Sequence, residues 1–541
     1  MYNITMGIPA FFSWIVKNHS NIVKKYTHNV LKVDNLYLDC NSIIYDAYSK
    51  MEFTNLTESV AISIIRRVIL KIEEYISIIQ PSKTVIIAFD GVAPVAKLEQ
   101  QRGRRYKSWY QNEVSRKIFN KETEDVWNTA AITPGTKFMH DLNELVSNHF
   151  STNQTVQEII VSGSNRYGEG EHKIFDFIRK NPEKHSDATT IIYGLDADLI
   201  MLSINHLPIC PKIYLFRETP HFIKSIDSSL EPESNYYLDI PELTSAIILN
   251  MSNDRVLSLE QQINTVYDYI FLCFFLANDF LPHFPAVNIR TGGVDKLLDA
   301  YKATITNDNL IENKRIKWGN VRKVVQHLAN LEENFMIKEH RSRNKKEHYV
   351  LPDRTPEEKY KKFEATPLYQ RDTEKFINPV KPDWQSRYYE ALFGISSEFG
   401  GSSEEDIQRV SINYLEGLEW TMKYYSSGCP DWRWRYKYNY PPLFQDLIRA
   451  IPLYDTNFIQ DKPENPVSEL VQLCYVLPRA SLHLLPRKLY MELLSRYEHW
   501  YKGNCNYVWA YCRYFWESHV EMNEIDIDEL ERFVSSGQIN K

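Results

Sequence analysis

Acidic residues recur where apolar runs of this sequence end. Asp39 ends the run NLYLD, Asp90 ends TVIIAFD, and Asp196 ends TTIIYGLD, with Asp198 two residues further on. A carboxylate in an apolar environment is unfavourable unless a cation or hydrogen bonds compensate it. A single aspartate after a strand is a common turn or helix-cap residue, but recurrence after three runs favours one shared site.

Three further carboxylates fit the same site. Glu169 and Glu171 begin an amphipathic stretch, and Asp279 follows the apolar stretch 266–277. Crowded carboxylates repel one another unless cations lie between them, and sites built from oxygen ligands favour Mg²⁺ or Mn²⁺. Two such ions roughly 3.5–4 Å apart can cleave a phosphodiester bond. We therefore predict that two Mg²⁺ (or Mn²⁺) ions are bound, and that the catalytic residues are Asp39, Asp90, Glu169, Glu171, Asp196, Asp198 and Asp279.

A basic segment follows Asp90 directly. If a helix begins near Pro94, then Lys97, Gln101, Arg104 and Arg105 lie on one face, at positions i, i+4, i+7 and i+8. Three cations and an amide near a predicted metal site form a suitable pocket for a phosphate group. The alternative is a basic helix face that only contacts water.

The elements that must position these residues are strands and helices in alternation. Five apolar runs with strand character occupy residues 35–40, 84–90, 157–164, 189–196 and 212–218. Each run is apolar along its length and does not alternate with polar residues, as expected for strands buried on both faces. Helical patterns, such as 57–79 and 168–180, separate the runs. This order predicts an α/β fold with a mainly parallel sheet. Ligands of such sheets bind outside the carboxyl ends of the strands, where the aspartates lie.

The 541 residues, 43% of them hydrophobic, are enough for more than one domain. We predict an α/β catalytic domain over 1–300 and a charged connection over 301–380, which contains RSRNKKEH and contacts solvent. The aromatic-rich remainder, 381–541, is predicted to be a mostly helical lobe packed on the first domain and completing the active-site channel.

Composition excludes several classes of protein. The net charge of −7 gives no global preference for nucleic acid, so any such surface must be local. Seven cysteines without CxxC spacing indicate a reduced, intracellular protein without a zinc module. The longest apolar run, 269–277, is shorter than the roughly 20 residues of a membrane span, and no leader peptide is expected. The sequence leaves the cytoplasm and the nucleus equally open.

Ten ordered stretches together carry a family resemblance. They include MGIPAFFSWI, NLYLDCNSIIYDAY, AFDGVAPVAKLEQQRGRRYKS, SGSNRYGEGEHKI, YGLDADLIMLS, DYIFLCFFLANDFLPHFP and GLEWTMKYYSSGCPDWRWRYKYNYPPLFQDL. In these stretches the chain resembles the XRN-type 5′→3′ exoribonucleases, over most of residues 6–490 apart from 300–380. The expectation is a short member, with both conserved regions but without the long carboxy-terminal extension.

The resemblance implies a PIN- and flap-nuclease-like catalytic domain with the same seven metal-binding acids. It implies that Lys97, Gln101, Arg104 and Arg105 bind a 5′-monophosphate. The leading bases of single-stranded RNA would stack between Tyr45 and a tryptophan, either Trp432 or Trp434. Tyr45 departs from the histidine usual in the family, and Ala10 departs from a basic residue.

The implied activity is processive, metal-dependent degradation that releases 5′-mononucleotides. The expected partner is single-stranded RNA with a 5′-monophosphate. No membrane association is expected, the protein partners are open, and a monomer is expected. Two alternatives stay open: a flap-type nuclease acting on DNA, and a catalytically silent RNA-binding scaffold that keeps the fold.

Overall fold

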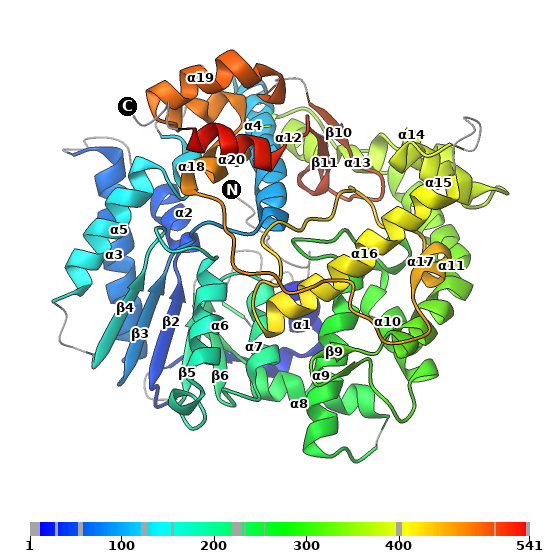
Figure 1. Ribbon diagram of the computed structural model, residues 1–541, viewed down its shortest axis with the longest axis horizontal. Coiled ribbons are helices and arrows are strands. Elements are labelled where there is room, and N and C mark those ends of the chain that lie inside the picture. Colours follow the sequence, from blue (N-terminus) through cyan, green and yellow to red (C-terminus); the bar gives the residue numbers. More distant parts are fainter. Residues whose placement is uncertain are drawn as a thin grey trace.

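The computed structural model describes residues 11–27, 31–51, 58–120, 127–152, 156–218, 230–231, 234–253, 255–396, 403–501 and 505–536 (Figure 1). Its centre is a seven-stranded sheet in the order β1-β7-β6-β5-β2-β3-β4. The strands are β1 (Val23–Lys25), β2 (Asn35–Asp39), β3 (Thr84–Ala88), β4 (Glu158–Ser162), β5 (Thr190–Tyr193), β6 (Ile213–Glu218) and β7 (Asn235–Asp239).

The sheet is mainly parallel, as the sequence predicts. Strands β4, β3, β2, β5 and β6 pair in parallel, and β7 pairs antiparallel with both β6 and β1. All five predicted strands are present, whereas β1 and β7 were not anticipated. Every residue of β2, β3 and β5 is buried, which explains why those runs lack an alternation of polar and apolar residues.

Helices cover both faces of the sheet. On one face Leu36 and Leu38 pack with α2 (Asn41–Ser49), α3 (Val60–Ile79) and α5 (Lys137–Phe150). On the other face Tyr37 packs in the core with α6 (Gly170–Lys180), α7 (Asp198–His206), α8 (Ile240–Ser252) and α9 (Leu259–Cys273). Successive side chains of β2 thus enter opposite cores, which is the ordinary geometry of a strand. Figure 1 shows α3 and α5 on one side of the sheet and α6 and α7 on the other.

The long helix α4 (Val95–Phe119) leaves the carboxyl edge of the sheet just after β3. It contacts α18 (Glu469–Val476), α12 (Pro356–Glu364) and β11 (His519–Glu521), which come from distant parts of the chain. Pro94 is its N-cap, so the predicted start of the basic helix is confirmed. Figure 1 shows α4 extending away from the sheet toward α12 and β11.

The rest of the described chain, from α10 onward, forms a mostly helical second lobe, whereas the sequence predicted a helical lobe for 381–541 alone. Its helices are α10 (Gly293–Thr304), α11 (Trp318–Glu347), α13 (Thr366–Tyr369), α14 (Asp372–Ile377), α15 (Trp384–Phe393), α16 (Ser403–Ser426), α17 (Phe444–Ala450), α19 (Arg487–Tyr497) and α20 (Ile527–Ser535). Short hairpins pair β8 (Ile311–Glu312) with β9 (Arg315–Ile316), and β10 (Asn506–Val508) with β11. Helix α1 (Phe11–Asn18) lies at the start of the described chain.

The expectation that 301–380 is a charged connection in solvent is wrong for much of that segment. Helix α11 is 30 residues long and buries Trp318, Val325 and Leu328 in the main core. The reason is that its charged residues cover the solvent side of a helix whose apolar residues recur at helical spacing. Some of its charges are themselves buried in pairs, among them Arg343 with Glu374.

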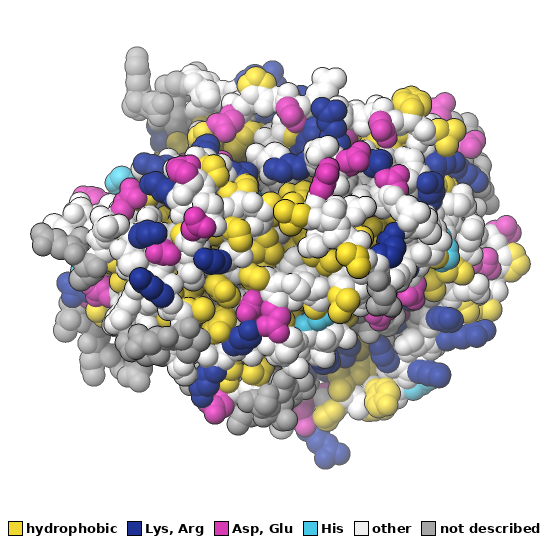
Figure 2. Space-filling view, turned by 90° about the horizontal axis from the view of Figure 1, so that it is seen from below, with side chains coloured by type: hydrophobic (Ala, Val, Ile, Leu, Met, Phe, Trp, Pro, Cys, Tyr) yellow, Lys and Arg dark blue, Asp and Glu magenta, His cyan; other side chains and the backbone are white. Residues whose placement is uncertain are grey.

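Charges of both signs are mixed on one face of the molecule. Figure 2 shows lysines and arginines interspersed with aspartates and glutamates on the face seen from below. None of the described helices is both long enough and apolar enough to cross a membrane.

Candidate active site

The predicted acids come together because their strands are neighbours. Strands β5, β2, β3 and β4 are adjacent and parallel, so their carboxyl ends meet at one edge of the sheet. A cavity of about 2690 Å³ opens there. Six of the seven acids line it: Asp39, Asp90, Glu169, Glu171, Asp196 and Asp279. The seventh, Asp198, begins α7 and is buried.

Hydrogen bonds fix the orientation of Asp90. The Gly170 amide, at the start of α6, donates to Asp90 Oδ1 over 2.8 Å. The side-chain amide of Asn41 donates to the other oxygen, and the Asp90 amide donates to Asn41 Oδ1 over 3.1 Å. Asn41 is therefore a supporting residue that the strand-end pattern did not single out, although it follows Asp39 by only two positions.

A glycine lets α6 approach the acids closely. A Cβ atom on Gly170 would lie 2.6 Å from Asp39 Oδ1, which is closer than real Cβ atoms come to other atoms. The absence of a side chain at this position therefore allows the first turn of α6, with Glu169 and Glu171, to sit against the end of β2.

Burial and mutual repulsion disfavour charge on four of these carboxyl groups in particular. Burial, and then neighbouring carboxylates, raise the pKa of Asp39, Glu171 and Asp198 well above the usual range and that of Asp196 to about 7. Three of the predicted acids each have a buried carboxylate oxygen without a hydrogen-bond partner among the described residues: Asp39 Oδ1, Glu171 Oε2 and Asp198 Oδ1. Unpartnered carboxylate oxygens in one crowded site fit a hard divalent cation.

Lys97 lies between the acids and the rest of the basic helix face. Its Nζ is 2.5 Å from Glu169 Oε1 and also contacts Asp279. Burial opposes the charge on Lys97, but Asp279 and Glu169 outweigh it and raise the lysine pKa well above its usual value. In this structure Lys97 thus neutralises two predicted metal ligands. Helix spacing alone did not predict these ion pairs.

The other three residues of the predicted phosphate pocket line the same cavity. Gln101 is buried and its Oε1 has no partner among the described residues. Arg105 donates to the Ile132 carbonyl over 3.5 Å, and burial lowers its pKa to about 10, so it is still charged at neutral pH. Arg104 is half-buried, and within the described chain its guanidinium makes no hydrogen bond or ion pair.

The predicted stacking residues are not brought together. Tyr45 lines the cavity, whereas Trp432 and Trp434 are buried outside its lining. Trp434 stacks on Trp420, with ring centroids 5.3 Å apart, and Trp432 meets Tyr167 edge-on at 5.4 Å. The aromatic density of this segment therefore packs the core. Ala10, the other predicted departure from the family, lies outside the described residues.

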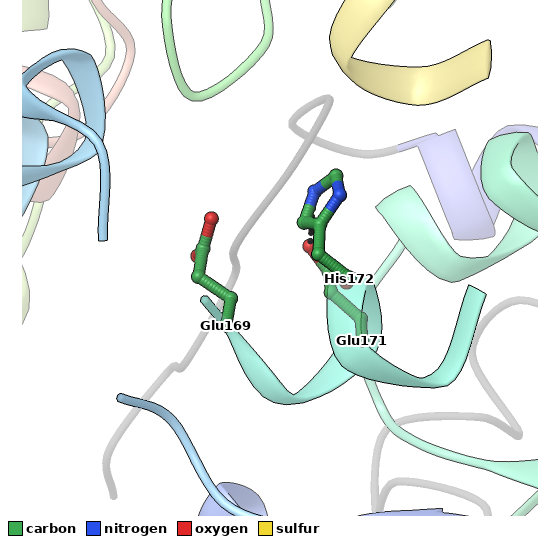
Figure 3. A group of neighbouring side chains, drawn as sticks. All are labelled: Glu169, Glu171 and His172. Atoms are coloured by element: carbon green, nitrogen blue, oxygen red, sulfur yellow. Dashed lines mark ion pairs between the residues drawn. The ribbon is translucent and has the colours of Figure 1, made fainter. Parts of the chain in front are cut away.

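The structure adds His172 to the acids, which sequence reasoning missed. Glu169, Glu171 and His172 offer ligand atoms that all lie within 4.8 Å of one another (Figure 3). Burial, and then Arg179, lower the pKa of His172 well below its usual value, so its imidazole is neutral. Its ring lies on that of Tyr424, with centroids 3.7 Å apart. In the sequence, the only indication that His172 belongs to this site is its position directly after Glu171.

Comparison with known proteins agrees with this architecture. Residues 6–219 match a family model described as "XRN 5'-3' exonuclease N-terminus", and residues 260–376 and 354–526 match the "Xrn1 helical domain". This chain belongs to the XRN exonuclease family. The helical-domain match includes most of the segment 300–380, where the motifs resembling the family were absent.

Curated relatives in the XRN family are similar over most of this chain. It is 26% identical to the 5'-3' exoribonuclease 2 homolog of Drosophila melanogaster, over 89% of this chain and 65% of that protein. It is 24% identical to 5'-3' exoribonuclease 2 of Arabidopsis thaliana, over 91% and 63%. It is 26% identical to 5'-3' exoribonuclease 1 of Saccharomyces cerevisiae, over 89% of this chain and 40% of that protein. The chain thus spans less than two thirds of the length of these relatives.

Proposed function

We propose that this protein is a 5′→3′ exoribonuclease. It would degrade single-stranded RNA with a 5′-monophosphate processively and release 5′-mononucleotides. The observation that carries the proposal is that six of the seven acids and the basic face of α4 line one cavity. A cleavage centre beside a phosphate pocket fits an enzyme that removes the terminal nucleotide. Family membership and the printed names of the relatives support the same reaction.

The acids are proposed to hold divalent metal ions. The unpartnered oxygens of Asp39, Glu171 and Asp198 fit such a role. When bound, two Mg²⁺ ions would supply an activated water and stabilise negative charge on the scissile phosphate. The chain would contribute the fixed orientation of Asp90, which Asn41 and the Gly170 amide provide.

The basic face of α4 is proposed to hold the 5′-phosphate. Arg104 and Arg105 offer charged donors, and Gln101 offers an amide with an unpartnered oxygen. Lys97 would contribute charge at the boundary between the phosphate pocket and the acids. A capped end or a hydroxyl end lacks the terminal phosphate monoester that these groups match.

Tyr45 is proposed to stack on a leading base. Stacking is worth about 1–3 kcal/mol per base and depends little on base identity, which suits an enzyme that accepts any sequence. Trp432 or Trp434 is proposed to stack on the other side of the bases. Both indoles are buried, so substitution of each tryptophan is needed to test this role.

Degradation of one end-labelled RNA tests the function. The RNA carries a 5′-monophosphate, a 5′-hydroxyl or a cap, and each form is incubated with Mg²⁺ or with EDTA. We expect only the monophosphate form to be consumed, with mononucleotides as product and no reaction in EDTA. A flap DNA substrate runs in parallel, and preferential cleavage of the flap would favour the DNA nuclease. RNA binding without degradation of any substrate would favour the silent scaffold.

A further inference from the structure

Two consecutive tyrosines of the helical lobe reach the acids of the catalytic domain. Tyr424 and Tyr425 lie near the end of α16, and both are almost fully buried. The Tyr424 hydroxyl donates to Glu169 Oε2 over 2.9 Å. The Tyr425 hydroxyl lies beside the carboxyl group of Asp198. Two predicted metal ligands thus lie against hydroxyl groups from the same turn of one distant helix.

The helix geometry explains why each tyrosine reaches a different acid. Successive residues of an α-helix point about 100° apart, so neighbouring tyrosines cannot share one acceptor position. Glu169 immediately precedes α6, whereas Asp198 begins α7. The end of α16 therefore bridges the starts of two helices that follow the sheet.

The tyrosine rings are held in place by their neighbours. Tyr424 lies between the imidazole of His172, at 3.7 Å, and the indole of Trp420, at 4.7 Å, measured between ring centroids. Phe280 meets Tyr424 edge-on at 5.2 Å, and Phe274 meets Tyr425 edge-on at 5.4 Å. Because the rings are confined in this way, their hydroxyl groups have fixed positions and can orient the carboxylates beside them.

Each tyrosine hydroxyl can occupy one oxygen of its carboxylate and leaves the other oxygen to another group. Tyr424 occupies Glu169 Oε2, while Glu169 Oε1 contacts Lys97. Asp198 lies beside the Tyr425 hydroxyl, and its Oδ1 is buried and has no hydrogen-bond partner among the described residues. A donor on one oxygen fixes the plane of a carboxylate and presents the other oxygen to a ligand.

We infer that Tyr424 and Tyr425 are positioning residues that orient Glu169 and Asp198 for a divalent cation. The inference rests on the proposed function, because it assigns a role to the same acids. Groups that hydrogen-bond to metal ligands orient them, and their loss typically lowers metal affinity or activity about 10–100-fold. The helical lobe would thus contribute to metal binding without supplying a ligand.

Removing the hydroxyl groups tests the inference. We compare Tyr424→Phe and Tyr425→Phe with Tyr388→Phe, whose fully buried hydroxyl donates to the Pro441 carbonyl over 2.9 Å. Each variant loses one buried hydroxyl and keeps its ring, so the comparison isolates the acceptor. The primary readout is Mn²⁺ binding by calorimetry without RNA, and thermal unfolding verifies the fold.

We expect Mn²⁺ affinity to fall about tenfold in Tyr424→Phe and in Tyr425→Phe, and to stay at the wild-type value in Tyr388→Phe. Mn²⁺ affinities that match Tyr388→Phe in both variants would overturn the inference. If one of the two variants does not fold, the other decides, because each tyrosine orients its own acid.

The same experiment separates this inference from the proposed function. RNA degradation by the wild-type protein, with unchanged Mn²⁺ affinity in both tyrosine variants, would overturn the positioning role and leave the proposed function standing. Weakened Mn²⁺ binding in the variants of a protein that degrades no RNA would support the positioning role and overturn the proposed function.

Discussion

At the scale of single residues, the site is a balance between buried carboxyl groups and the few groups that compensate them. Lys97 neutralises Glu169 and Asp279, and Asn41 with the Gly170 amide satisfies Asp90. Asp39, Glu171 and Asp198 each keep one oxygen that has no hydrogen-bond partner within the described chain. A change at any of these positions therefore alters the electrostatics of the whole cluster.

Asp196→Asn should abolish RNA turnover. The substitution keeps the size of the side chain but removes a carboxylate from the wall of the cavity. We expect turnover to fall by at least about a hundredfold, the lower end of the range for a lost electrostatic contribution at one site. RNA binding should stay measurable in EDTA. Turnover at the wild-type rate would contradict the metal-site assignment.

Gly170→Ala should damage the site without removing a charged group. The new methyl would lie 2.6 Å from Asp39 Oδ1, so either the start of α6 or Asp39 must move. We expect a loss of about tenfold or more in Mn²⁺ affinity, measured by calorimetry. The matched control is Gly319→Ala in α11, where a Cβ meets nothing within 4 Å. Equal affinities in the two variants would show that α6 tolerates the methyl.

Arg104→Gln should reduce the preference for 5′-monophosphate over 5′-hydroxyl RNA. A hydrogen bond to a charged group contributes about 1.5–3 kcal/mol, so we expect the kcat/KM ratio of the two substrates to fall about 10–100-fold. Lys117→Gln, at an exposed position further along α4, serves as the control. An unchanged ratio in Arg104→Gln would exclude this arginine from the phosphate pocket.

At the scale of elements, a buried acid joins two helices of the second lobe. Glu332 of α11 accepts hydrogen bonds from the Phe444 amide over 2.8 Å and the Gln445 amide over 3.2 Å, at the start of α17. It thereby satisfies amides that a helix start leaves without partners. Burial raises the pKa of Glu332 to about 8, despite these two donors.

The pKa of Glu332 predicts a loss of stability as pH rises. Between about pH 4.5 and 8 the unfolded chain releases this proton while the native state keeps it, so the free energy of unfolding falls by about 1.4 kcal/mol per pH unit. Glu332→Gln should remove this component. Chemical unfolding between pH 5 and 9 measures it, and identical pH dependences in wild type and variant would contradict the assignment.

At the scale of the whole molecule, buried ion pairs tie distant segments of the second lobe together. Glu374 of α14 accepts from Arg343 of α11 over 2.7 Å and from Arg371 over 2.6 Å. The Tyr511 amide donates to the same carboxylate over 2.8 Å. Because α11 also enters the main core, this cluster connects the segment around Tyr511 to the body of the molecule.

Glu374→Ala should destabilise the protein strongly. Removing one partner of a buried charge cluster leaves the others uncompensated, which typically costs about 3–5 kcal/mol. Chemical unfolding should register that loss, whereas Glu357→Ala, at an exposed position on α12, should change stability little. A small effect at Glu374 would mean that water reaches the two arginines in the variant.

Much of the catalytic domain could be predicted from local patterns. Strands β2, β3 and β5 were recognisable because burial on both faces makes them continuously apolar. The three-residue strand β1 and the antiparallel strand β7 were missed, since their pairing depends on contacts across the sheet. Helix α11 was mistaken for a connection because its charged surface masked its apolar spacing.

The sequence by itself determined the identity of the acids and their attachment to strand ends, because both depend on residues close together in the chain. Only the tertiary structure decided which groups surround those acids. Strand order brought Asp39, Asp90 and Asp196 to one edge, and Lys97 turned toward Glu169 and Asp279. Tyr424 reaches Glu169 across 255 positions, while Trp432 and Trp434 turned into the core. These contacts arise from how whole layers pack, and no local pattern of residues encodes them.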